Sequence, residues 1–181
     1  KLLKESIHKL DHFIIDVLDY CRSKRLEMKP ESINFREIIE DIASGLKHLS
    51  QGEKNVDIKV TVDQNNEFCS DRVGLSIVLN NLVSNAIRYK DPKSSEPFVN
   101  IEVSTSDDKA NIIVKDNGIG ISKELQGKIF DMFYRVSDES EGTGLGLFIV
   151  KHVVEMHKGS IHVKNNSPRG SIFEVSIPVG A

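Results

Sequence analysis

One segment of the chain contains two asparagines and an arginine that could share one face of a helix. Asn81, Asn85 and Arg88 are four and three residues apart, which is the spacing of neighbouring side chains on an α-helix. Amide carbonyl oxygens are hard ligands that suit Mg²⁺, and an arginine can grip phosphate oxygens. Asparagines in helices also often cap or bond locally, so this segment alone does not establish a metal site.

A second segment, from Asp116 to Gly120, reads Asp-Asn-Gly-Ile-Gly and follows an expected strand. The carboxylate of Asp116 can accept a hydrogen bond from the exocyclic amine of a base. The glycines Gly118 and Gly120 would let the backbone approach a flat ring closely. The same residues are also typical of a plain Asp-Asn-Gly turn, so both interpretations stay open for this segment by itself.

A third segment, from Gly142 to Gly146, reads Gly-Thr-Gly-Leu-Gly and runs into an expected helix. Glycines before a helix N-terminus expose backbone N–H groups toward anions. No strand leads directly into this segment, as a dinucleotide fingerprint requires, and no Gly-Lys-Ser/Thr follows it, as in a Walker loop. The segment therefore indicates a phosphate-binding loop of another type, and its signal is weak when taken alone.

The hydrophobic pattern predicts the elements that must position these three segments. Apolar residues alternate in the expected strands and recur every three to four residues in the expected helices. Strands are expected at 32–35, 56–62, 99–103, 112–114, 160–164 and 172–177, and helices at 36–50, 71–89 and 147–157. A polar hairpin connection is expected at 104–110 and a turn at 168–170. The pattern predicts an α+β fold, a two-layer sandwich with helices on one face of a mixed sheet.

Residues 1 to about 28 are expected to form one long helix before this sandwich. Its apolar residues follow a 4, 3, 4, 3, 4 spacing: Leu3, Ile7, Leu10, Ile14, Val17 and Cys21. This strict heptad seam favours a dimerisation helix over a helix packed on its own domain. Because proline lacks an N–H, Pro30 is expected to end the helix. The expected domains are therefore residues 1–29 and 30–181.

Composition limits the classes of function. The 181 residues are 39% hydrophobic and 28% charged, which fits one globular domain with an extra element. The formal net charge of -3 gives no electrostatic reason to expect nucleic acid as a partner. No apolar run approaches the roughly 20 residues of a membrane-spanning helix. Cys21 and Cys69 are interpreted as core thiols, and the expected setting is the cytoplasm.

Taken together and in this order, the segments resemble the motifs of the GHKL ATP-binding family, specifically the sensor histidine kinases of two-component systems. Residues 81–89 are similar to the family's N box, 116–120 to its G1 box, 130–135 to its F box and 142–146 to its G2 box. The resemblance runs from about Glu31 to Pro178, and residues 1–28 resemble the second helix of the dimerisation hairpin. It implies a Bergerat-type fold that binds ATP and Mg²⁺. The implied partners are a phosphoacceptor histidine hairpin and a response regulator receiver domain, within a homodimeric parent protein.

The resemblance also implies a role for each matching residue. Asn85 would hold Mg²⁺ with Asn81 beside it, and Asp116 would recognise the adenine amino group. Asn81, Arg88 and Arg135 are the residues expected to act in catalysis. The other implied contacts are Arg88 with phosphate, Tyr89 with the base, Gly118 and Gly120 around adenine, Phe130 and Phe133 as lid anchors, Gly142, Thr143, Gly144, Leu145 and Gly146 over the triphosphate, and Arg135 with the γ-phosphate.

Asn81 bears on the kind of ATP chemistry. Hydrolytic relatives of the gyrase type carry a glutamate four residues before the magnesium asparagine, and this chain has Asn81 there. An amide cannot take a proton near neutral pH, so the pattern favours transfer to an imidazole over activation of water. Two alternatives stay open, a GHKL-type ATPase and a nucleotide-binding regulatory module without kinase activity.

The histidine that would receive the phosphate is expected outside this chain. The family's acceptor is followed by an acidic residue, whereas Lys9 follows His8 and Phe13 follows His12. We therefore expect a fragment that begins after the acceptor helix, binds nucleotide and does not phosphorylate itself. His152 and His157 are expected to be structural or surface residues.

The stretch from Asn117 to Gly146 is expected to act as a lid. It has few apolar residues, and residues 137–141 are highly polar. Few buried contacts imply low local stability. The lid is therefore expected to be partly disordered without ligand and ordered by the phosphates.

Overall fold

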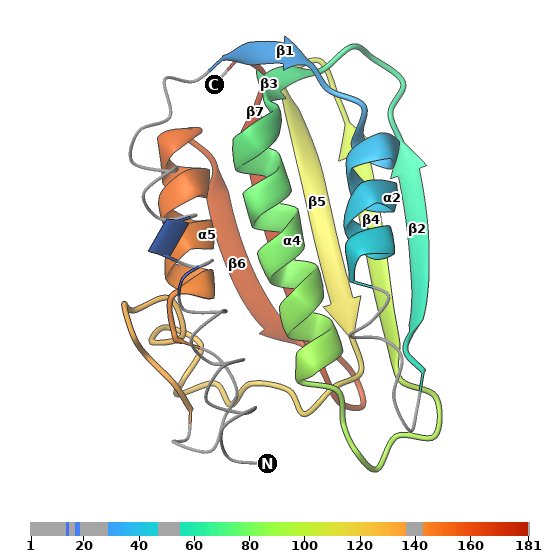
Figure 1. The fold of residues 1–181 in the computed structure, drawn as a ribbon, viewed down its shortest axis with the longest axis vertical. Helices are drawn as coiled ribbons and strands as arrows, with labels where there is room; N and C mark the ends of the chain where they lie inside the picture. Colours follow the sequence, from blue (N-terminus) through green and yellow to red (C-terminus); the bar gives the residue numbers. More distant parts are fainter. Residues whose placement is uncertain (1–13, 15–16, 19–28, 47–54, 137–142, 181) are drawn as a thin grey trace.

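The computed structural model describes residues 14, 17–18, 29–46, 55–136 and 143–180. Within them, three helices cover one face of a five-stranded sheet, as Figure 1 shows. The elements follow the order β1 (Pro30–Ser32), α2 (Phe35–Gly45), β2 (Asp57–Asp63), β3 (Cys69–Asp71), α4 (Arg72–Arg88), β4 (Phe98–Thr105), β5 (Lys109–Asp116), α5 (Gly146–Met156), β6 (Ser160–Asn165) and β7 (Ser171–Pro178). This arrangement confirms the predicted α+β sandwich.

The main sheet has the strand order β2-β4-β5-β7-β6 and is mixed. Strand β2 pairs with β4 in parallel, and the other neighbours pair antiparallel. The short strands β1 and β3 form a separate antiparallel pair. In Figure 1, α4 and β5 end, and α5 begins, at the same lower end of the molecule. The segments 81–89, 116–120 and the described part of 142–146 therefore meet there.

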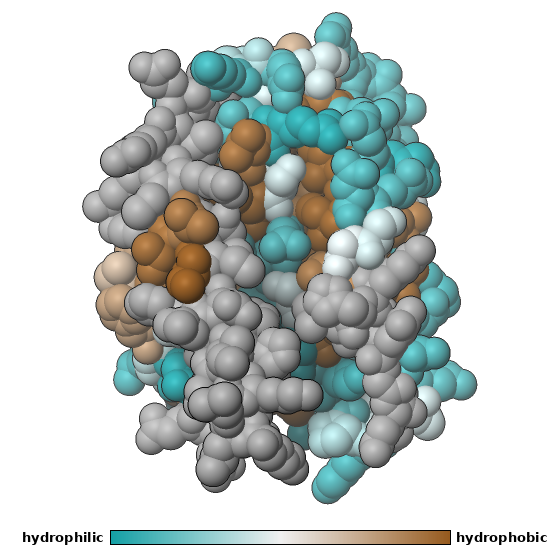
Figure 2. Space-filling model, viewed as in Figure 1, coloured by the Kyte–Doolittle hydropathy of each residue, from teal (hydrophilic) through white to brown (hydrophobic). Residues whose placement is uncertain are grey.

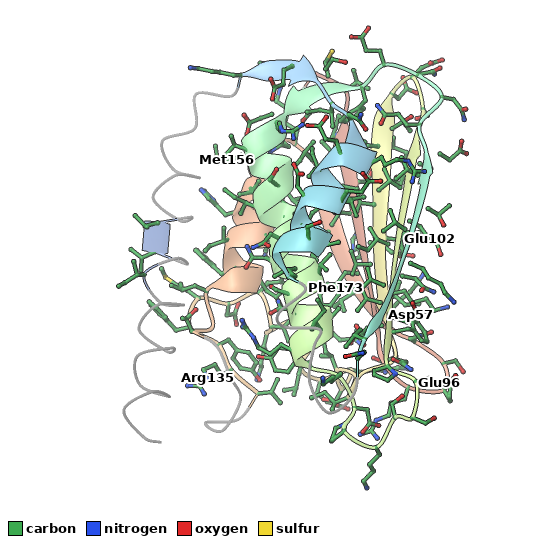
Figure 3. All side chains as sticks on the ribbon, turned by 45° about the vertical axis from the view of Figure 1, so that its right-hand side comes forward. Asp57, Glu96, Glu102, Arg135, Met156 and Phe173 are labelled. Atoms are coloured by element: carbon green, nitrogen blue, oxygen red, sulfur yellow. The ribbon has the colours of Figure 1, made fainter. Side chains whose placement is uncertain are left out.

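The strands have one face against the helices and one face away from them. In β7, buried residues alternate with half-buried ones, and Phe173, Val175 and Ile177 belong to the core. Figure 3 shows Asp57 and Glu102 on the opposite side of the sheet from the helices. This alternation is the period-2 pattern of a sheet that is covered on one face.

Helix α4 forms the centre of the helical layer. Its buried residues include Leu75, Leu79 and Leu82, each at most 1% exposed. The carboxylate of Asp71 caps its N-terminus by accepting a hydrogen bond from the N–H of Gly74 at 2.6 Å. Figure 2 shows hydrophobic side chains along α4 on the helix-covered face, with hydrophilic residues above them. Replacing one of the buried leucines with alanine would cost about 3 kcal/mol of stability.

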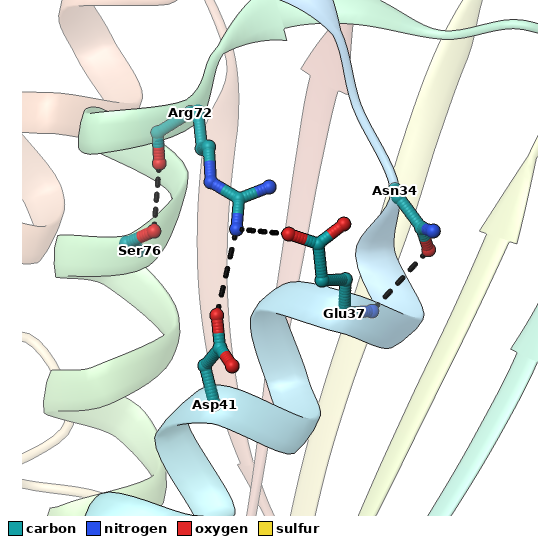
Figure 4. Close-up of polar contacts among 5 residues, drawn as sticks. All are labelled: Asn34, Glu37, Asp41, Arg72 and Ser76. Carbon is teal, nitrogen blue, oxygen red and sulfur yellow. Dashed lines mark hydrogen bonds and ion pairs between the residues drawn. The ribbon is translucent and has the colours of Figure 1, made fainter.

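Polar contacts fix the start of α2 against the start of α4 (Figure 4). Asn34 caps α2 by accepting a hydrogen bond from the N–H of Glu37 at 3.2 Å. The Nη2 of Arg72 lies 2.8 Å from Oε1 of Glu37 and 3.5 Å from Oδ2 of Asp41. Exposed ion pairs of this kind contribute about 0.5 kcal/mol each, so they orient the two helices more than they stabilise the fold.

Two sequence predictions near the start of the sandwich need correction. The strand predicted at 32–35 is wrong beyond Ser32, because Asn34 caps α2 and Phe35 begins it. Phe35 is fully buried and its ring lies 5.5 Å from that of Phe68, so the apolar pair at 33 and 35 reflects core packing, not strand alternation. Strand β3 was not predicted, since three residues are too few to show periodicity.

Some predictions fall on residues outside the described part of the chain. Of the long helix at 1–28, the structure describes Ile14, Val17 and Leu18, and all three are helical. The rest of the heptad seam, Cys21, His8 and His12 lie outside the described residues, as do residues 47–50 of the predicted second helix. None of the described helices has the length and apolar character needed to cross a bilayer.

Candidate functional site

A cavity of about 290 Å³ opens at the end of the molecule where α4 and β5 end. Its walls come from α4, the end of β5, the segment after β5, the start of α5 and the start of β7. The lining residues are Asn85, Ala86, Tyr89, Asp116, Ile119, Gly120, Ile121, Ser122, Leu125, Ile129, Tyr134, Arg135, Val136, Leu147, Ser171 and Phe173. Most of these side chains are apolar, which suits a flat ring with a few polar anchors.

Asp116 is the acidic group of this cavity. It ends β5, is 6% exposed, and its Oδ1 accepts hydrogen bonds from the N–H groups of Gly118 at 2.8 Å and Ser171 at 3.1 Å. Burial raises the pKa of its carboxyl, and the two backbone hydrogen bonds oppose that rise. None of the described residues donates to Oδ2. The carboxylate is thus oriented through one oxygen and can accept a ligand donor through the other.

The two glycines after Asp116 are required for different structural reasons. A Cβ on Gly118 would lie 2.3 Å from the carbonyl oxygen of Tyr89, and Ile119 donates to that oxygen at 3.0 Å. Gly118 therefore lets the segment pack on the end of α4 and does not itself line the cavity. Gly120 lines the cavity, has a φ of +75° and faces Gly170. Only glycine takes that conformation at little cost.

The two helix asparagines lie in different surroundings. Asn85 lines the cavity, while Asn81 is 7% exposed and does not. Nδ2 of Asn81 donates to the carbonyl of Ile77 at 2.9 Å. A Cβ on Gly146 would lie 2.7 Å from Oδ1 of Asn81, so that glycine lets α5 approach the amide. The structure thus places Asn81 between the two helices, beside the start of α5.

Helix α5 begins at the last residue of the glycine-rich segment, after an apolar N-cap residue. Its N-cap residue is Leu145, whose side chain makes no capping hydrogen bond. Thr143 Oγ1 accepts a hydrogen bond from the N–H of Leu145 at 3.1 Å, which shapes the approach to the helix. A helix N-terminus attracts anions because its N–H groups and the helix dipole both favour negative charge. Gly142 lies outside the described residues.

A backbone contact joins Phe133 to Gly144. The N–H of Phe133 donates to the carbonyl of Gly144 at 3.0 Å, and both residues have left-handed backbones, with φ of +63° and +75°. A Cβ on Gly144 would lie 2.6 Å from the carbonyl carbon of Phe133. Phe133 is 57% exposed and lies outside the cavity wall, whereas Phe130 packs against the core. Phe133 therefore joins the residues around 133 to those before α5 through its main chain. Its left-handed conformation is costly for a bulky residue.

The basic residues expected near phosphate lie at different places. Arg135 lies on the segment between β5 and α5 (Figure 3) and lines the cavity. Tyr89, which follows α4, lines the cavity as well. Arg88 is the last residue of α4, is half-buried and does not line the cavity. Of the residues predicted for the site, the cavity brings together Asn85, Tyr89, Asp116, Gly120 and Arg135.

Sequence reasoning missed the contribution of β7. Ser171 and Phe173 line the cavity, and Ser171 is hydrogen-bonded to Asp116 although 55 residues separate them. The β5–β7 register, which pairs Lys115 with Ile172, brings the start of β7 beside the end of β5. The predicted turn at 168–170 was the one signal that could have located Ser171, because it fixes where β7 begins.

Comparison with known proteins reveals a family relationship. Residues 70–181 match the family model described as histidine kinase-, DNA gyrase B-, and HSP90-like ATPase. The match includes α4, Asp116, α5 and β7, and so every element that lines the cavity.

Two curated relatives are similar over nearly the whole chain. The methanogenesis regulatory histidine kinase FilI of Methanothrix harundinacea is 31% identical over 98% of this chain and 20% of its own length. The sensor-like histidine kinase SenX3 of Mycolicibacterium smegmatis is 34% identical over 98% of this chain and 47% of its own length. The chain thus spans between a fifth and a half of these relatives. Among solved structures, the mycobacterial sensor histidine kinase MprB has a TM-score of 0.69 at 25% identity, covering 83% of this chain and 97% of that one.

Proposed function

Because the chain belongs to the family of histidine kinase-, DNA gyrase B-, and HSP90-like ATPases, we propose that it is the ATP-binding catalytic domain of a sensor histidine kinase. It would transfer the γ-phosphate of Mg-ATP to a histidine in two-component signal transduction. The observation that carries this proposal is Asp116, a buried carboxylate oriented by two backbone N–H groups in an apolar cavity.

An adenine base would suit the lining of this cavity. Oδ2 of Asp116 would accept a hydrogen bond from the 6-amino group of adenine. Guanine has a carbonyl oxygen at that position, which would face the carboxylate as a second acceptor. Apolar residues of the wall, such as Ile121, Leu125 and Phe173, would contact the ring. Adenine is therefore the purine that this site would select.

The phosphates would extend from the base toward α5. Asn85 lines the cavity on α4, and the N-terminal turn of α5 adjoins it through Leu147. The Asn85 amide oxygen would hold Mg²⁺, whose other ligands would be phosphate and water oxygens, as is usual for this ion. Mg²⁺ would supply neutralisation of phosphate charge. Arg135 is the cavity-lining cation that would approach the phosphates, and Gly144 and Gly146 would leave room for them.

Asn81 favours phosphoryl transfer over hydrolysis. It stands where the hydrolytic relatives have a glutamate, and its amide nitrogen is used in a hydrogen bond to Ile77. An amide does not accept a proton from water. In the proposed reaction the acceptor imidazole attacks the γ-phosphorus, the bond from that phosphorus to the bridging oxygen breaks, and ADP leaves.

The proposal extends to partners, domains and setting. The acceptor would be a histidine hairpin of the same protein or its dimer mate, and a receiver domain would take the phosphate from it. Residues 1–29 would belong to the hairpin and 30–181 to the catalytic domain. The parent protein would be a homodimer whose catalytic domains lie in the cytoplasm, where ATP is available.

The test mixes this chain with Mg-ATP labelled at the γ-phosphate and a separately produced helical hairpin carrying a histidine followed by an acidic residue. We expect acid-labile, alkali-stable label on the hairpin. A hairpin with that histidine replaced by alanine should stay unlabelled. Free phosphate without hairpin label would instead support the ATPase, and tight binding with neither product would support the regulatory module.

A further inference from the structure

We propose that the ion pair between Asp91 and Arg169 positions Asp116 for recognition of the base. Arg169 would be a positioning residue for adenine binding, although it does not line the cavity. This inference rests on the proposed ATP site and deepens it. It assigns a role in base selectivity to a turn that lies outside the cavity wall.

The ion pair joins two segments that are distant in sequence. Nη1 of Arg169 lies 2.6 Å from Oδ2 of Asp91, across 78 residues. The Asp91 side chain is 11% exposed, and its Oδ1 accepts a hydrogen bond from the N–H of Lys93 at 2.9 Å. One carboxylate oxygen thus shapes the loop after α4 and the other holds Arg169. A poorly solvated carboxylate of this kind needs its partner more than an exposed one does.

The turn that carries Arg169 packs closely against the main chain of Asp116. A Cβ on Gly170 would lie 2.1 Å from the main-chain oxygen of Asp116. Nδ2 of Asn166 donates to that oxygen at 2.8 Å, and the N–H of Asn166 donates to the carbonyl of Gly170 at 3.0 Å. Ser171, two residues after Arg169, donates its N–H to the Asp116 carboxylate at 3.1 Å. The position of this turn therefore sets one of the two hydrogen bonds that orient the carboxylate.

The segment from Asp116 to Gly120 lies between this turn and the end of α4. On one side Ile119 donates to the carbonyl of Tyr89 at 3.0 Å, and on the other Gly170 faces Gly120. Nε of Arg169 also reaches the carbonyl of Ile119 at 3.5 Å. The Asp91–Arg169 pair connects the two flanking segments directly. Releasing it would loosen the turn and, through Ser171, the orientation of the Asp116 carboxylate.

This mechanism predicts a loss of base selectivity, not a general loss of binding. A displaced carboxylate no longer meets the 6-amino group of adenine, while contacts to the ribose and phosphates remain. Inosine diphosphate carries a 6-carbonyl oxygen in place of the 6-amino group, so it cannot donate to Asp116 and reports the remaining contacts together with the repulsion between that oxygen and the carboxylate. The affinity ratio between ADP and inosine diphosphate therefore isolates the contribution of Asp116.

The experiment measures both nucleotides by titration calorimetry with the wild-type chain and with Arg169→Gln. We expect ADP to bind about tenfold more weakly to the variant, with inosine diphosphate binding unchanged or more tightly, because its 6-carbonyl oxygen no longer faces the carboxylate. Arg169→Lys retains the charge and should recover most of the ADP affinity. Lys164→Gln is the matched control, because Lys164 pairs with Glu174 at 2.5 Å on the same hairpin, away from the cavity.

A double-mutant cycle completes the test. Asp91→Asn keeps an oxygen for the N–H of Lys93 and removes the charge that holds Arg169. Combining it with Arg169→Gln should add little to either single loss of selectivity. Equal ADP selectivity in wild type and Arg169→Gln would overturn the inference, as would equal weakening of both nucleotides. Failure of the wild-type chain to prefer ADP would instead count against the proposed ATP site.

Discussion

Asp116 and the first turn of α5 adjoin the same cavity, but their polar groups are satisfied differently. The Asp116 carboxylate accepts two backbone hydrogen bonds, and its main-chain oxygen accepts a third from Asn166. The N-cap residue of α5, Leu145, has an apolar side chain that makes no capping hydrogen bond. At the other end of the molecule, Asp71 caps α4.

This difference indicates separate roles for the two ends of the cavity, one facing the base and one facing the phosphates. Groups that would meet the base are held in place before a ligand arrives, which lowers the cost of ordering them on binding. At the α5 terminus, in contrast, the helix dipole favours a partner with negative charge. The base end would therefore supply selectivity, and the phosphate end would be completed by the ligand itself.

Asp116→Ala should break the base end and give the largest effect. Loss of the acceptor for the 6-amino group should weaken ADP and ATP equally, by about a hundredfold or more, and leave the fold intact. Titration calorimetry measures the affinities and circular dichroism the fold. Asp131→Ala, an exposed aspartate on the segment after β5, is the control. Unchanged affinity for both nucleotides would refute the adenine role.

Asn85→Ala should affect the phosphate end. We expect Mg-ATP to bind about thirtyfold more weakly, because an amide oxygen ligand is lost, with adenosine binding nearly unchanged. Repeating the titration with a chelator tests the metal, since wild type and variant should then bind ATP similarly. Asn80→Ala is the control from the same helix, since Asn80 does not line the cavity. A loss of adenosine affinity would assign Asn85 to the base end instead.

Gly144→Ala tests the backbone contact beside α5. A Cβ there meets the main chain of Phe133 and a φ of +75°, so the Phe133–Gly144 contact should open. We expect about tenfold weaker ATP binding from a strain of one to two kcal/mol, with a smaller effect on adenosine. Gly127→Ala is the matched control, because a Cβ at Gly127 meets nothing within 4 Å. Equal losses for ATP and adenosine would show that the two ends are not separable.

Asp116→Asn should give the smallest effect. The quantity affected is the free energy of unfolding of the nucleotide-free protein. Burial raises the folded-state pKa of this carboxyl, so its protonated form stabilises the fold at low pH and that stability is lost as pH rises through the folded pKa. The variant should therefore be more stable than wild type by about 1 kcal/mol near pH 7. The difference should vanish below the ordinary aspartate pKa of 3.8.

Urea unfolding at several pH values measures this difference. The control Asp131→Asn should show no such dependence, because Asp131 is exposed. A variant that is less stable at pH 7 would mean that the backbone hydrogen bonds outweigh the burial of the charge. The ionised Asp116 carboxylate would then stabilise the fold. It would not be a destabilising group that is retained for ligand binding.

The lid prediction remains to be tested by hydrogen exchange. Residues 119–136 and 143–146 should gain protection when Mg-ATP binds, because the phosphates would order them. Residues 137–142 lie outside the described part of the chain. Equal protection with and without Mg-ATP would contradict the expectation.

Local patterns in the sequence predicted most of the helical layer. The helix expected at 71–89 is α4 with its two caps, Asp71 and Tyr89, because a capping aspartate and a long apolar period act within a few residues. The strand at Val56 to Val62 agrees with β2 to one residue, since its alternation is uninterrupted. Short elements were predicted less well, as β1 and the missed β3 illustrate.

Long-range packing limited what could be predicted of the site. The spacing of Asn81 and Asn85 gives a common helix face, yet α5 covers Asn81 and leaves Asn85 at the cavity. Ser171 was missed because strand pairing, not local sequence, brings it to Asp116. Gly118 was assigned to the base, and the structure shows that the Tyr89 carbonyl is what requires a glycine there.

The two hairpin turns of the sheet have opposite consequences for protein engineering. Both expose residues at their tips, at Asp107 and Asp108 between β4 and β5 and at Pro168 and Arg169 between β6 and β7. Exposed tips usually tolerate an inserted peptide tag or fluorescent label. The β4–β5 tip should do so, because it lies at the far end of the sheet from Asp116. An insertion at the β6–β7 tip should instead alter nucleotide binding, because Gly170 has no space between the turn and Asp116.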